Sequence, residues 1–355
     1  MIGFGLIGCG RIAERHIASL AKLAGGRLTA ICDVQDARMA AAEQEYRRLS
    51  GTQHRIAAYR DVKPLLQDER VQAVVIATPS AFHAELAKQA IASGKHVILE
   101  KPMALSLRDA EHIVREAERR QVVVQVCHQL RYKPVMMQAK RLIDAGAMGR
   151  LYLGVVSMRL QRSGAYYEAA PWRGTWDQDG GMLLNQGIHL IDLLQWFMGD
   201  GLDVYGSMQR GPIPKQTEDV AAGIVTFQGG AIGIVEANTL TFPGNLDNSL
   251  TLFGEKGTIS IGGIRLNEIR KWAFADATVP APEDNGDADE HLLMYEQFIR
   301  AMAGGEASMM IDAAEGKKAL ELIFALYESV RTCKAVPLPL ANFSTEMMAD
   351  WEEWK

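Results

Sequence analysis

The chain has 355 residues, of which 48% are apolar and 23% are charged, and its formal net charge is −5. At about 150 residues per domain, this length predicts two domains that can each bury a core. The composition excludes a disordered or fibrous chain, and the scattered Lys and Arg residues exclude the basic surface of a nucleic-acid-binding protein.

Cysteine and histidine usage limits the chemistry further. The four cysteines lie far apart without a Cys-x-x-Cys pair, and the eight histidines contain no His-x-x-x-His pair, so we expect a reducing compartment and no metal. The chain begins with a strand-like run at residues 2–7 rather than a basic leader, and no uncharged apolar run approaches the ~20 residues of a membrane span. These features predict a cytoplasmic protein without a membrane partner.

Strand-like runs and helical patterns alternate through the first third of the chain. The strand-like runs cover residues 2–7, 28–32, 73–77, 96–99 and 122–126, and the helical patterns cover residues 11–23, 37–49, 82–92 and 106–119. This alternation predicts βαβ units, and therefore an α/β Rossmann domain with a doubly wound parallel sheet over residues 1–126.

Longer strands with period-two alternation follow from about residue 150. They cover residues 151–160, 203–209, 220–227, 231–237 and 249–253, with a helical pattern at 182–197 after the first strand. Residues 275–289 are typical of a loop, and two helical patterns follow at 291–302 and 313–333. We therefore predict a second, α+β domain over residues 127–355 with a mainly antiparallel sheet, and a last helix that packs back near the first domain.

A glycine-rich turn joins the first strand to the first helix. In Gly8-Cys-Gly10-Arg11-Ile12-Ala13, Gly8 permits the tight turn and Gly10 lets a pyrophosphate approach the backbone, while the peptide units of Arg11 and Ile12 lead into the helix N-terminus. The pattern predicts a dinucleotide site, although a Gly-rich turn without a ligand is the simpler alternative.

An acidic residue closes the second strand at the spacing at which a carboxylate accepts hydrogen bonds from the adenosine ribose. This residue is Asp33, and Val34 and Gln35 follow it without a Lys or Arg to bind a 2′-phosphate. The pattern favours NAD over NADP, with a helix-capping Asp as the alternative.

Two further polar segments each follow a strand-like run. Because ligands bind beyond the carboxyl ends of parallel strands, Thr78-Pro79-Ser80 and Glu100-Lys101-Pro102 are expected to face the same crevice. A Lys at a buried strand end is costly unless it meets a charge or a polar substrate. An ion pair between Lys101 and Glu100 at the rim of the sheet is the alternative.

Together with a late Gly180-Gly181 and Gly187-Ile-His189-x-x-Asp192, these motifs resemble the glucose-fructose oxidoreductase / inositol dehydrogenase / MocA (Gfo/Idh/MocA) family. The resemblance spans roughly residues 1–335. It implies an NAD-dependent oxidation of a secondary hydroxyl of a sugar, polyol or sugar acid. It also implies a large open sheet in the second domain, often used to build homodimers or homotetramers.

The resemblance assigns the catalytic pair to Lys101 and His189, which flank the nicotinamide and the reacting carbon in the family, where the Lys-Pro peptide is commonly cis. The chemistry suits both residue types, because an imidazole can accept the hydroxyl proton and an ammonium can stabilise the developing alkoxide. Taken alone, a His in an apolar helix is more often a packed core residue.

One departure from the family concerns the residue four positions before His189, where an Asp is frequent and this chain has Asn185. A neutral amide orients an imidazole without raising its basicity as a carboxylate would. We hypothesise that Asn185 contacts the substrate and that the missing charge makes room for an anionic one, such as a uronate or a nucleotide-sugar acid.

Further site residues follow from position in the resemblance. Trp172 and Arg173 match a Trp-Arg pair near the nicotinamide carboxamide, with a loop-anchoring Trp and a solvated Arg as the alternative. Gln129 replaces an Asn that contacts the cofactor. The remaining expectations are Arg131 and Tyr166 as substrate contacts, Arg162 and Tyr167 on the loop that covers the substrate, and His83 as a cofactor contact or simply the start of a helix.

Three functions are compatible with these residues. The first is an NAD-dependent sugar or polyol dehydrogenase, and the second is a redox-neutral glycosidase or epimerase that retains bound NAD. The third is a catalytically silent nucleotide-binding sensor, against which the presence of both Lys101 and His189 argues. Formation of NADH with substrate distinguishes the first from the second.

Overall fold

The computed structural model describes residues 1–282 and 288–351, which form two compact units. The first unit comprises residues 1–104, 108–132 and 289–317, and the second comprises the described residues among 105–107, 133–288 and 318–355. The sequence placed the boundary after residue 126. Residues 289–317 join the first unit because α9 (Glu290–Met302) buries Met294, Tyr295 and Phe298 in the same core as α1 (Ala13–Lys22).

A six-stranded parallel sheet forms the first unit. Its strand order is β3 (Ala57–Tyr59), β2 (Gly26–Cys32), β1 (Ile2–Ile7), β4 (Ala73–Ile76), β5 (His96–Leu99) and β6 (Val124–Val126). The connecting helices are α1, α2 (Asp36–Ser50), α3 (Val62–Gln67), η1 (Ser80–Phe82), α4 (His83–Ala92) and α5 (Leu107–Arg120), and η2 (Gln129–Tyr132) follows β6. This order confirms the predicted doubly wound sheet, whose central strands are continuous apolar runs because helices cover both faces.

An eight-stranded sheet forms the second unit. Its order is β13 (Glu268–Phe274), β12 (Gly257–Gly262), β11 (Asp247–Gly254), β7 (Leu151–Arg159), β10 (Ile232–Asn238), β9 (Val220–Phe227), β8 (Gly201–Gln209) and β14 (Val336–Pro337). All neighbouring strands are antiparallel except β7 and β10, which run parallel. The expected mainly antiparallel sheet is thus confirmed.

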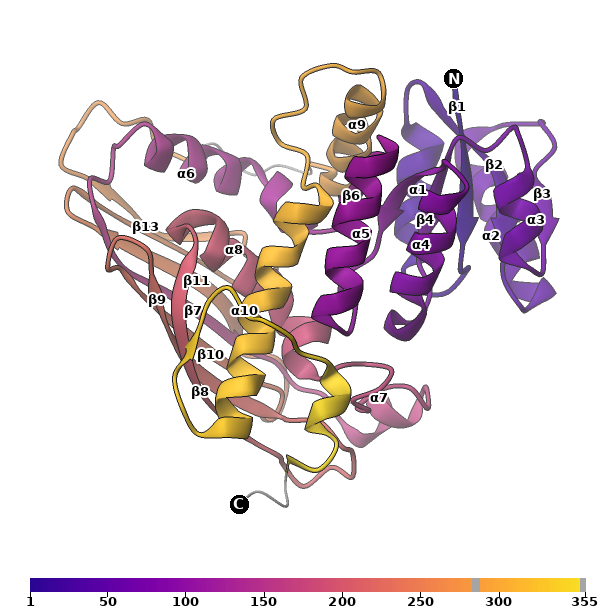
Figure 1. Cartoon of the computed structure of the whole chain (residues 1–355). Coiled ribbons are helices and arrows are strands. Elements are labelled where there is room, and N and C mark those ends of the chain that lie inside the picture. The colour runs from indigo at the N-terminus through magenta and orange to yellow at the C-terminus, as the bar shows by residue number, and fades with distance from the viewer. Residues whose placement is uncertain (283–287, 352–355) are drawn as a thin grey trace. The chain divides into compact units, whose positions relative to one another are not determined.

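Within the described residues of this unit, helices cover one face of the second sheet and leave the other uncovered (Figure 1). A Cβ at Gly223 would lie 2.2 Å from Leu326 of α10 (Ala313–Thr332), and one at Gly154 would lie 2.7 Å from Leu194 of α8 (Ile188–Met198). Glycines on the inner face therefore let both helices pack close to the strands. The remaining helical segments of this unit are α6 (Pro134–Asp144), α7 (Gly164–Glu168), η3 (Leu183–Gly187) and η4 (Thr345–Met348).

The pattern at residues 182–197, predicted as one helix, is divided in two. A π-helical turn, η3, precedes the α-helix α8. Such turns insert an extra residue into a helix and are frequent at functional sites. Part of the loop predicted at 275–289 lies outside the described residues.

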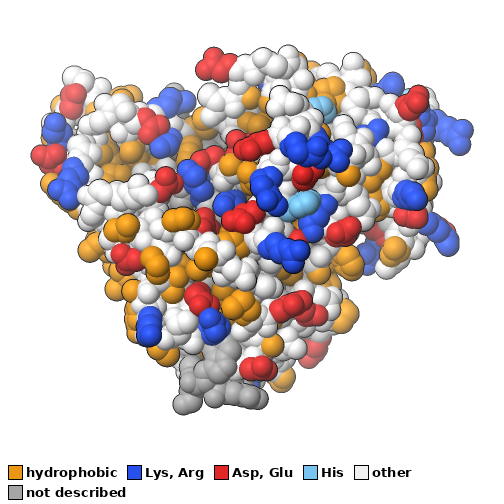
Figure 2. Space-filling view, in the orientation of Figure 1, with side chains coloured by type: hydrophobic (Ala, Val, Ile, Leu, Met, Phe, Trp, Pro, Cys, Tyr) orange, Lys and Arg blue, Asp and Glu red, His pale blue; other side chains and the backbone are white. Residues whose placement is uncertain are grey.

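The surface carries charges of both signs. On the face drawn in Figure 2, Lys and Arg side chains are interspersed with Asp and Glu side chains. None of the helices in the described residues has the length and apolar character needed to cross a membrane.

Candidate active site

The turn after β1 has the geometry of a phosphate-binding loop. Gly8 has a φ of +91°, and a Cβ there would lie 2.6 Å from the carbonyl oxygen of Ala77, so only glycine fits. At Gly10, by contrast, a Cβ would meet no atom within 4 Å. The helix α1 begins at Ala13 without a side-chain cap. An open backbone surface before an uncapped helix N-terminus fits a dinucleotide pyrophosphate.

Asp33 lies just beyond the end of β2, where the sequence predicted a ribose ligand. Its Oδ2 accepts a hydrogen bond of 2.8 Å from the Cys9 amide, and its Oδ1 accepts one of 2.9 Å from the Gln35 amide. These two donors fix the carboxylate beside the glycine-rich turn and leave acceptor capacity for ribose hydroxyls. The next side chain, Val34, is 80% exposed and apolar, which fits NAD rather than NADP.

His83 braces two segments of the candidate cofactor site. Its Nδ1 lies 2.7 Å from the carbonyl oxygen of Pro102 and its Nε2 lies 2.8 Å from that of Thr78. Burial lowers the pKa of His83, against the opposing effect of these two carbonyls. Both ring nitrogens lie against backbone carbonyls and His83 begins α4, while its predicted contact with the cofactor stays a prediction.

Thr78 provides a polar atom that fits a ligand at this edge of the sheet. Its hydroxyl is buried and makes no hydrogen bond within the part of the chain that the structure describes. Pro79 follows it directly and precedes η1. An orphaned hydroxyl beyond the carboxyl end of β4 is consistent with a cofactor contact at Thr78 and Pro79.

Glu100 is held by a buried chain of hydrogen bonds that reaches α1 and α9. Its Oε1 lies 3.0 Å from Nε2 of His16, whose Nδ1 lies 2.9 Å from the hydroxyl of Tyr295. Its Oε2 accepts a hydrogen bond of 3.2 Å from the Lys101 amide. Burial acts to raise the pKa of Glu100, but the hydrogen bond and charge of His16, together with the charge of Lys101, lower it to about 2. Glu100 thus serves to anchor the backbone at Lys101.

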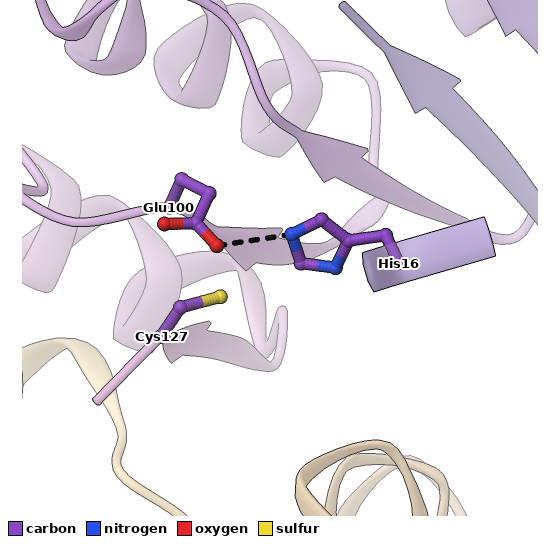
Figure 3. Close-up of side chains that lie close together, drawn as sticks. All are labelled: His16, Glu100 and Cys127. Atoms are coloured by element: carbon purple, nitrogen blue, oxygen red, sulfur yellow. Dashed lines mark hydrogen bonds and ion pairs between the residues drawn. The ribbon is translucent and has the colours of Figure 1, made fainter. Parts of the chain in front are cut away.

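Cys127 lies beside this pair, and Figure 3 shows the three side chains converging. Ligand atoms of His16, Glu100 and Cys127 all lie within 4.8 Å of one another, which is a possible metal-ligand set. A metal ion there would have to break the His16–Glu100 hydrogen bond, and burial raises the pKa of the Cys127 thiol, which disfavours the thiolate. We therefore interpret the cluster as a hydrogen-bonded support for Glu100.

The Lys101–Pro102 peptide bond is cis, as the resemblance implied. Two further residues of the first unit, Gln129 and Arg131, were predicted to lie in the site. Gln129 begins η2 and is partly exposed. Arg131 is only 3% exposed, and its Nη1 donates to Oε2 of Glu315 at 3.2 Å. This ion pair ties η2 to α10, and the substrate contact at Arg131 stays a prediction.

His189 lies in the first turn of α8, in the second unit. It is partly exposed, as are Asn185 and Gln186 of η3, while Leu184, Gly187 and Ile188 are buried. These three polar side chains are therefore the ones that η3 and the start of α8 leave accessible.

The amide of Asn185 is held by a carboxylate that the sequence did not point to. Its Nδ2 donates to Oδ1 of Asp179, which is 3% exposed and whose Oδ2 accepts a hydrogen bond of 2.8 Å from the Gly174 amide. The negative charge that is absent from position 185 is thus present one hydrogen bond away. This weakens the idea that Asn185 alone makes room for an anion.

An aromatic and basic group lies on and beside α7. The guanidinium of Arg173 lies 4.3 Å from the centre of the Tyr166 ring and 5.5 Å from that of Trp172, and Arg162 lies 5.2 Å from the Tyr166 ring. Gln186 donates to the Tyr166 hydroxyl at 3.3 Å. The loop predicted to cover the substrate is thereby connected to η3.

A buried carboxylate supports the start of η3. Glu218 is fully buried, and its Oε1 accepts hydrogen bonds from the Leu183 amide at 2.9 Å and the Tyr327 hydroxyl at 2.7 Å. Burial raises its pKa to about 6. Sequence reasoning missed this residue, because its contact with Leu183 joins positions 35 residues apart.

A parallel sheet whose first turn fits a dinucleotide, joined to a second unit with an accessible His on a helix, is the arrangement of a two-domain oxidoreductase with a Rossmann fold. The chain belongs to the Gfo/Idh/MocA family: residues 2–128 match the oxidoreductase family with the NAD-binding Rossmann fold, and residues 136–260 match the Gfo/Idh/MocA C-terminal domain. The family and the cofactor NAD predicted from the sequence are therefore confirmed.

Similar proteins are NAD-linked dehydrogenases. The WlbA dehydrogenase of Bordetella pertussis, solved with NADH and UDP-GlcNAcA, is 35% identical over 96% of this chain and 99% of its own, with a TM-score of 0.85. The WlbA dehydrogenase of Chromobacterium violaceum, solved with the same ligands, is 34% identical over 96% of each chain, with a TM-score of 0.86. The scyllo-inositol 2-dehydrogenase (NAD(+)) of Bacillus subtilis is 29% identical over 96% of this chain and 98% of its own. This chain is accordingly an NAD-dependent dehydrogenase.

Proposed function

We propose that the chain oxidises a secondary hydroxyl of a nucleotide-linked sugar acid related to UDP-GlcNAcA, with NAD as the hydride acceptor. The observation that carries the proposal is the likeness to the WlbA dehydrogenases, which at 34–35% identity extends over 96% of this chain. The presence of Lys101 and His189 in the matching motifs supports a working catalytic pair rather than a silent sensor.

Bound NAD supplies the nicotinamide carbon that accepts the hydride. In this proposal, His189 accepts the proton of the substrate hydroxyl as the hydride leaves the carbon. The role that the family resemblance gives Lys101 is to stabilise the negative charge that develops on the substrate oxygen, while Glu100 anchors the backbone at Lys101. Asn185 contacts the substrate, with its amide fixed by Asp179.

The test is NADH formation across matched substrates: UDP-GlcNAcA, UDP-GlcNAc, whose sugar lacks the carboxylate, free glucuronate and myo-inositol. We expect the highest kcat/KM with UDP-GlcNAcA and a loss of at least about 100-fold in kcat in Lys101→Met and His189→Asn. A higher kcat/KM with myo-inositol would contradict the substrate class. Product release without NADH would instead indicate the redox-neutral alternative.

We also propose that the uncovered face of the second sheet joins copies of the chain into a homodimer or homotetramer. Tyr205, Ile224 and Ile234 lie on this face at 50%, 53% and 38% exposure and are opposite one another across β8, β9 and β10. A row of exposed apolar side chains supports an interface. All four cysteines are free, which supports a cytoplasmic location.

A further inference from the structure

Two arginines approach one tyrosine in the second unit. Arg162 and Arg173 flank α7 in the chain, and their guanidinium carbons lie 5.2 and 4.3 Å from the centre of the Tyr166 ring. Each uses one Nη1–H on backbone: Arg162 on the Gln161 carbonyl at 2.8 Å and Arg173 on the Tyr166 carbonyl at 2.7 Å. Both side chains are thus held in place by backbone and by the same ring.

Neither guanidinium pairs with a carboxylate in residues 1–282 and 288–351, and the buried Nε of each makes no hydrogen bond there. Among the described residues, the one further hydrogen-bond acceptor of the Arg162 side chain is Oδ1 of Asn245, at 3.5 Å. Nearby arginines behave differently: Arg159, three residues earlier in the chain, donates to Glu236 at 2.7 Å. The two positive charges beside the Tyr166 ring repel each other, which costs electrostatic free energy. An anion bound to both guanidinium groups would offset this repulsion.

The pair is linked to the accessible part of η3. Gln186 donates to the Tyr166 hydroxyl at 3.3 Å, and its Oε1 is buried without a hydrogen bond in the described chain. Gln186 directly follows Asn185 and precedes His189 by three residues. The two guanidinium groups are therefore linked through Tyr166 and Gln186 to the turn that carries Asn185. Guanidinium groups match the oxyanions of carboxylates and phosphates in geometry.

We infer that Arg162 and Arg173, stacked on Tyr166, form an oxyanion-binding subsite for the substrate. This inference rests on the proposed function and deepens it, because it assigns recognition of the acid to named residues. The oxyanion has two possible sources in a nucleotide-linked sugar acid, the carboxylate of the sugar and the diphosphate of the nucleotide.

Binding measurements by calorimetry on the intact, NADH-loaded protein test the subsite. The probes are UDP-GlcNAcA, which carries both oxyanions, UDP-GlcNAc, which carries only the diphosphate, and glucuronate, which carries only the carboxylate. We expect Arg162→Met and Arg173→Met to raise the Kd of UDP-GlcNAcA about 10- to 100-fold, because charged hydrogen bonds are lost. Arg162→Lys should recover part of the loss, and Arg159→Met is the matched control that should change nothing.

The probes separate the two sources. A raised Kd for glucuronate with an unchanged Kd for UDP-GlcNAc assigns the subsite to the carboxylate, and the reverse assigns it to the diphosphate. The Kd of NADH is measured in parallel. An Arg173→Met variant that weakens only NADH, together with an Arg162→Met variant that changes no Kd, would overturn the inference.

The outcome also separates the inference from the proposed function. If the wild type oxidises UDP-GlcNAcA and neither arginine variant alters its Kd, the function stands and the subsite does not. If the wild type does not oxidise UDP-GlcNAcA but binds glucuronate or UDP-GlcNAc in an arginine-dependent way, the subsite stands and the substrate is another acid. Absence of binding by all three probes contradicts both.

Discussion

Asn185 lies between a buried carboxylate and the helical turn that leads to His189. Its Nδ2 is committed to Asp179, so the orientation of the amide, and with it the direction of Oδ1, is fixed. A neutral amide at position 185 is still oriented by the carboxylate of Asp179. It adds no second negative charge at the position where we propose that the substrate binds. The negative charge needed to fix the amide is supplied by Asp179, inside the core of the second unit.

Asp179→Asn tests this arrangement. The variant loses the charged acceptor that holds Asn185, and we expect kcat to fall about tenfold while the KM for NAD stays unchanged, because charged hydrogen bonds contribute roughly 1.5–3 kcal/mol. Asp177→Asn, two residues earlier and exposed, is the matched control. Equal losses in both variants, or a raised KM for NAD, would count against a role for Asp179 in the substrate half of the site.

We propose that Asp33 is the residue that selects NAD over NADP. Its carboxylate would repel a 2′-phosphate. Arg38, on the first turn of α2, is close enough for its positive charge to act on Cys9, whose amide binds Asp33, so a cation is already near this position. We therefore expect Asp33→Ser to raise the ratio of kcat/KM for NADP to that for NAD by about 10- to 100-fold. A ratio unchanged within a factor of two would show that the ribose end of the site lies elsewhere.

Among the elements, η3 depends on a residue from another part of the chain. The amide of Leu183, at its start, donates to Glu218, which lies in the segment between β8 and β9. The Oε2 of this carboxylate is buried and makes no hydrogen bond to any described residue. The π-helical turn is thus supported by a carboxyl group that ionises less readily in the folded chain than in the unfolded chain.

The pH dependence of unfolding follows from this carboxylate. Burial raises the pKa of Glu218 from 4.5 to about 6, so the folded state binds its proton more tightly than the unfolded state does. Its contribution to stability is complete below pH 4.5 and is lost as the pH rises through 6, a difference of about 2 kcal/mol. Glu218→Gln, which keeps an acceptor for Leu183, should therefore gain stability relative to wild type between pH 4.5 and pH 8. Urea unfolding curves at both pH values measure this, and a constant difference would refute it.

The helices and strands show which parts of the fold and of the candidate site can be predicted from the sequence. Gly8, Asp33 and Lys101 were predictable, because each follows a strand whose apolar run is visible and the ends of parallel strands meet at one edge. The short strand β3 and helix α3 were not predicted, since three and six residues give too little periodicity.

Contacts between distant segments account for the rest of the site. The pairing of His16 with Glu100 joins residues 84 positions apart, and that of His16 with Tyr295 joins residues 279 apart. Asp179 and Asn185 are near in sequence, but their contact depends on the turn at Gly180 and Gly181, both of positive φ. Motifs that are formed by neighbouring residues could therefore be predicted from the sequence. The side chains that support these motifs come from distant segments and could not be predicted.

At the scale of the whole molecule, the described helices of the second unit cover one face of the second sheet and leave the other uncovered. Its strands alternate buried and exposed positions, and the exposed set includes apolar residues at positions where a solvated sheet would carry polar ones. Ile224 is 53% exposed at the centre of the row formed with Tyr205 and Ile234. Burial of this row against a second copy would remove apolar surface from water, at about 25 cal/mol per Å².

Ile224→Lys tests this face as an interface. A charge at the centre of the row would have to be buried without a partner on association, so we expect the mass measured by light scattering to fall from that of a dimer or tetramer to that of one chain. Leu49→Lys, at an exposed apolar position on α2 of the first unit, is the control and should leave the mass unchanged. Because Ile224 lies on the uncovered face and not among the site residues, NADH binding should persist in the variant. A wild-type protein that already has the mass of one chain, or an Ile224→Lys variant that keeps the full assembly, would show that the apolar row does not join copies.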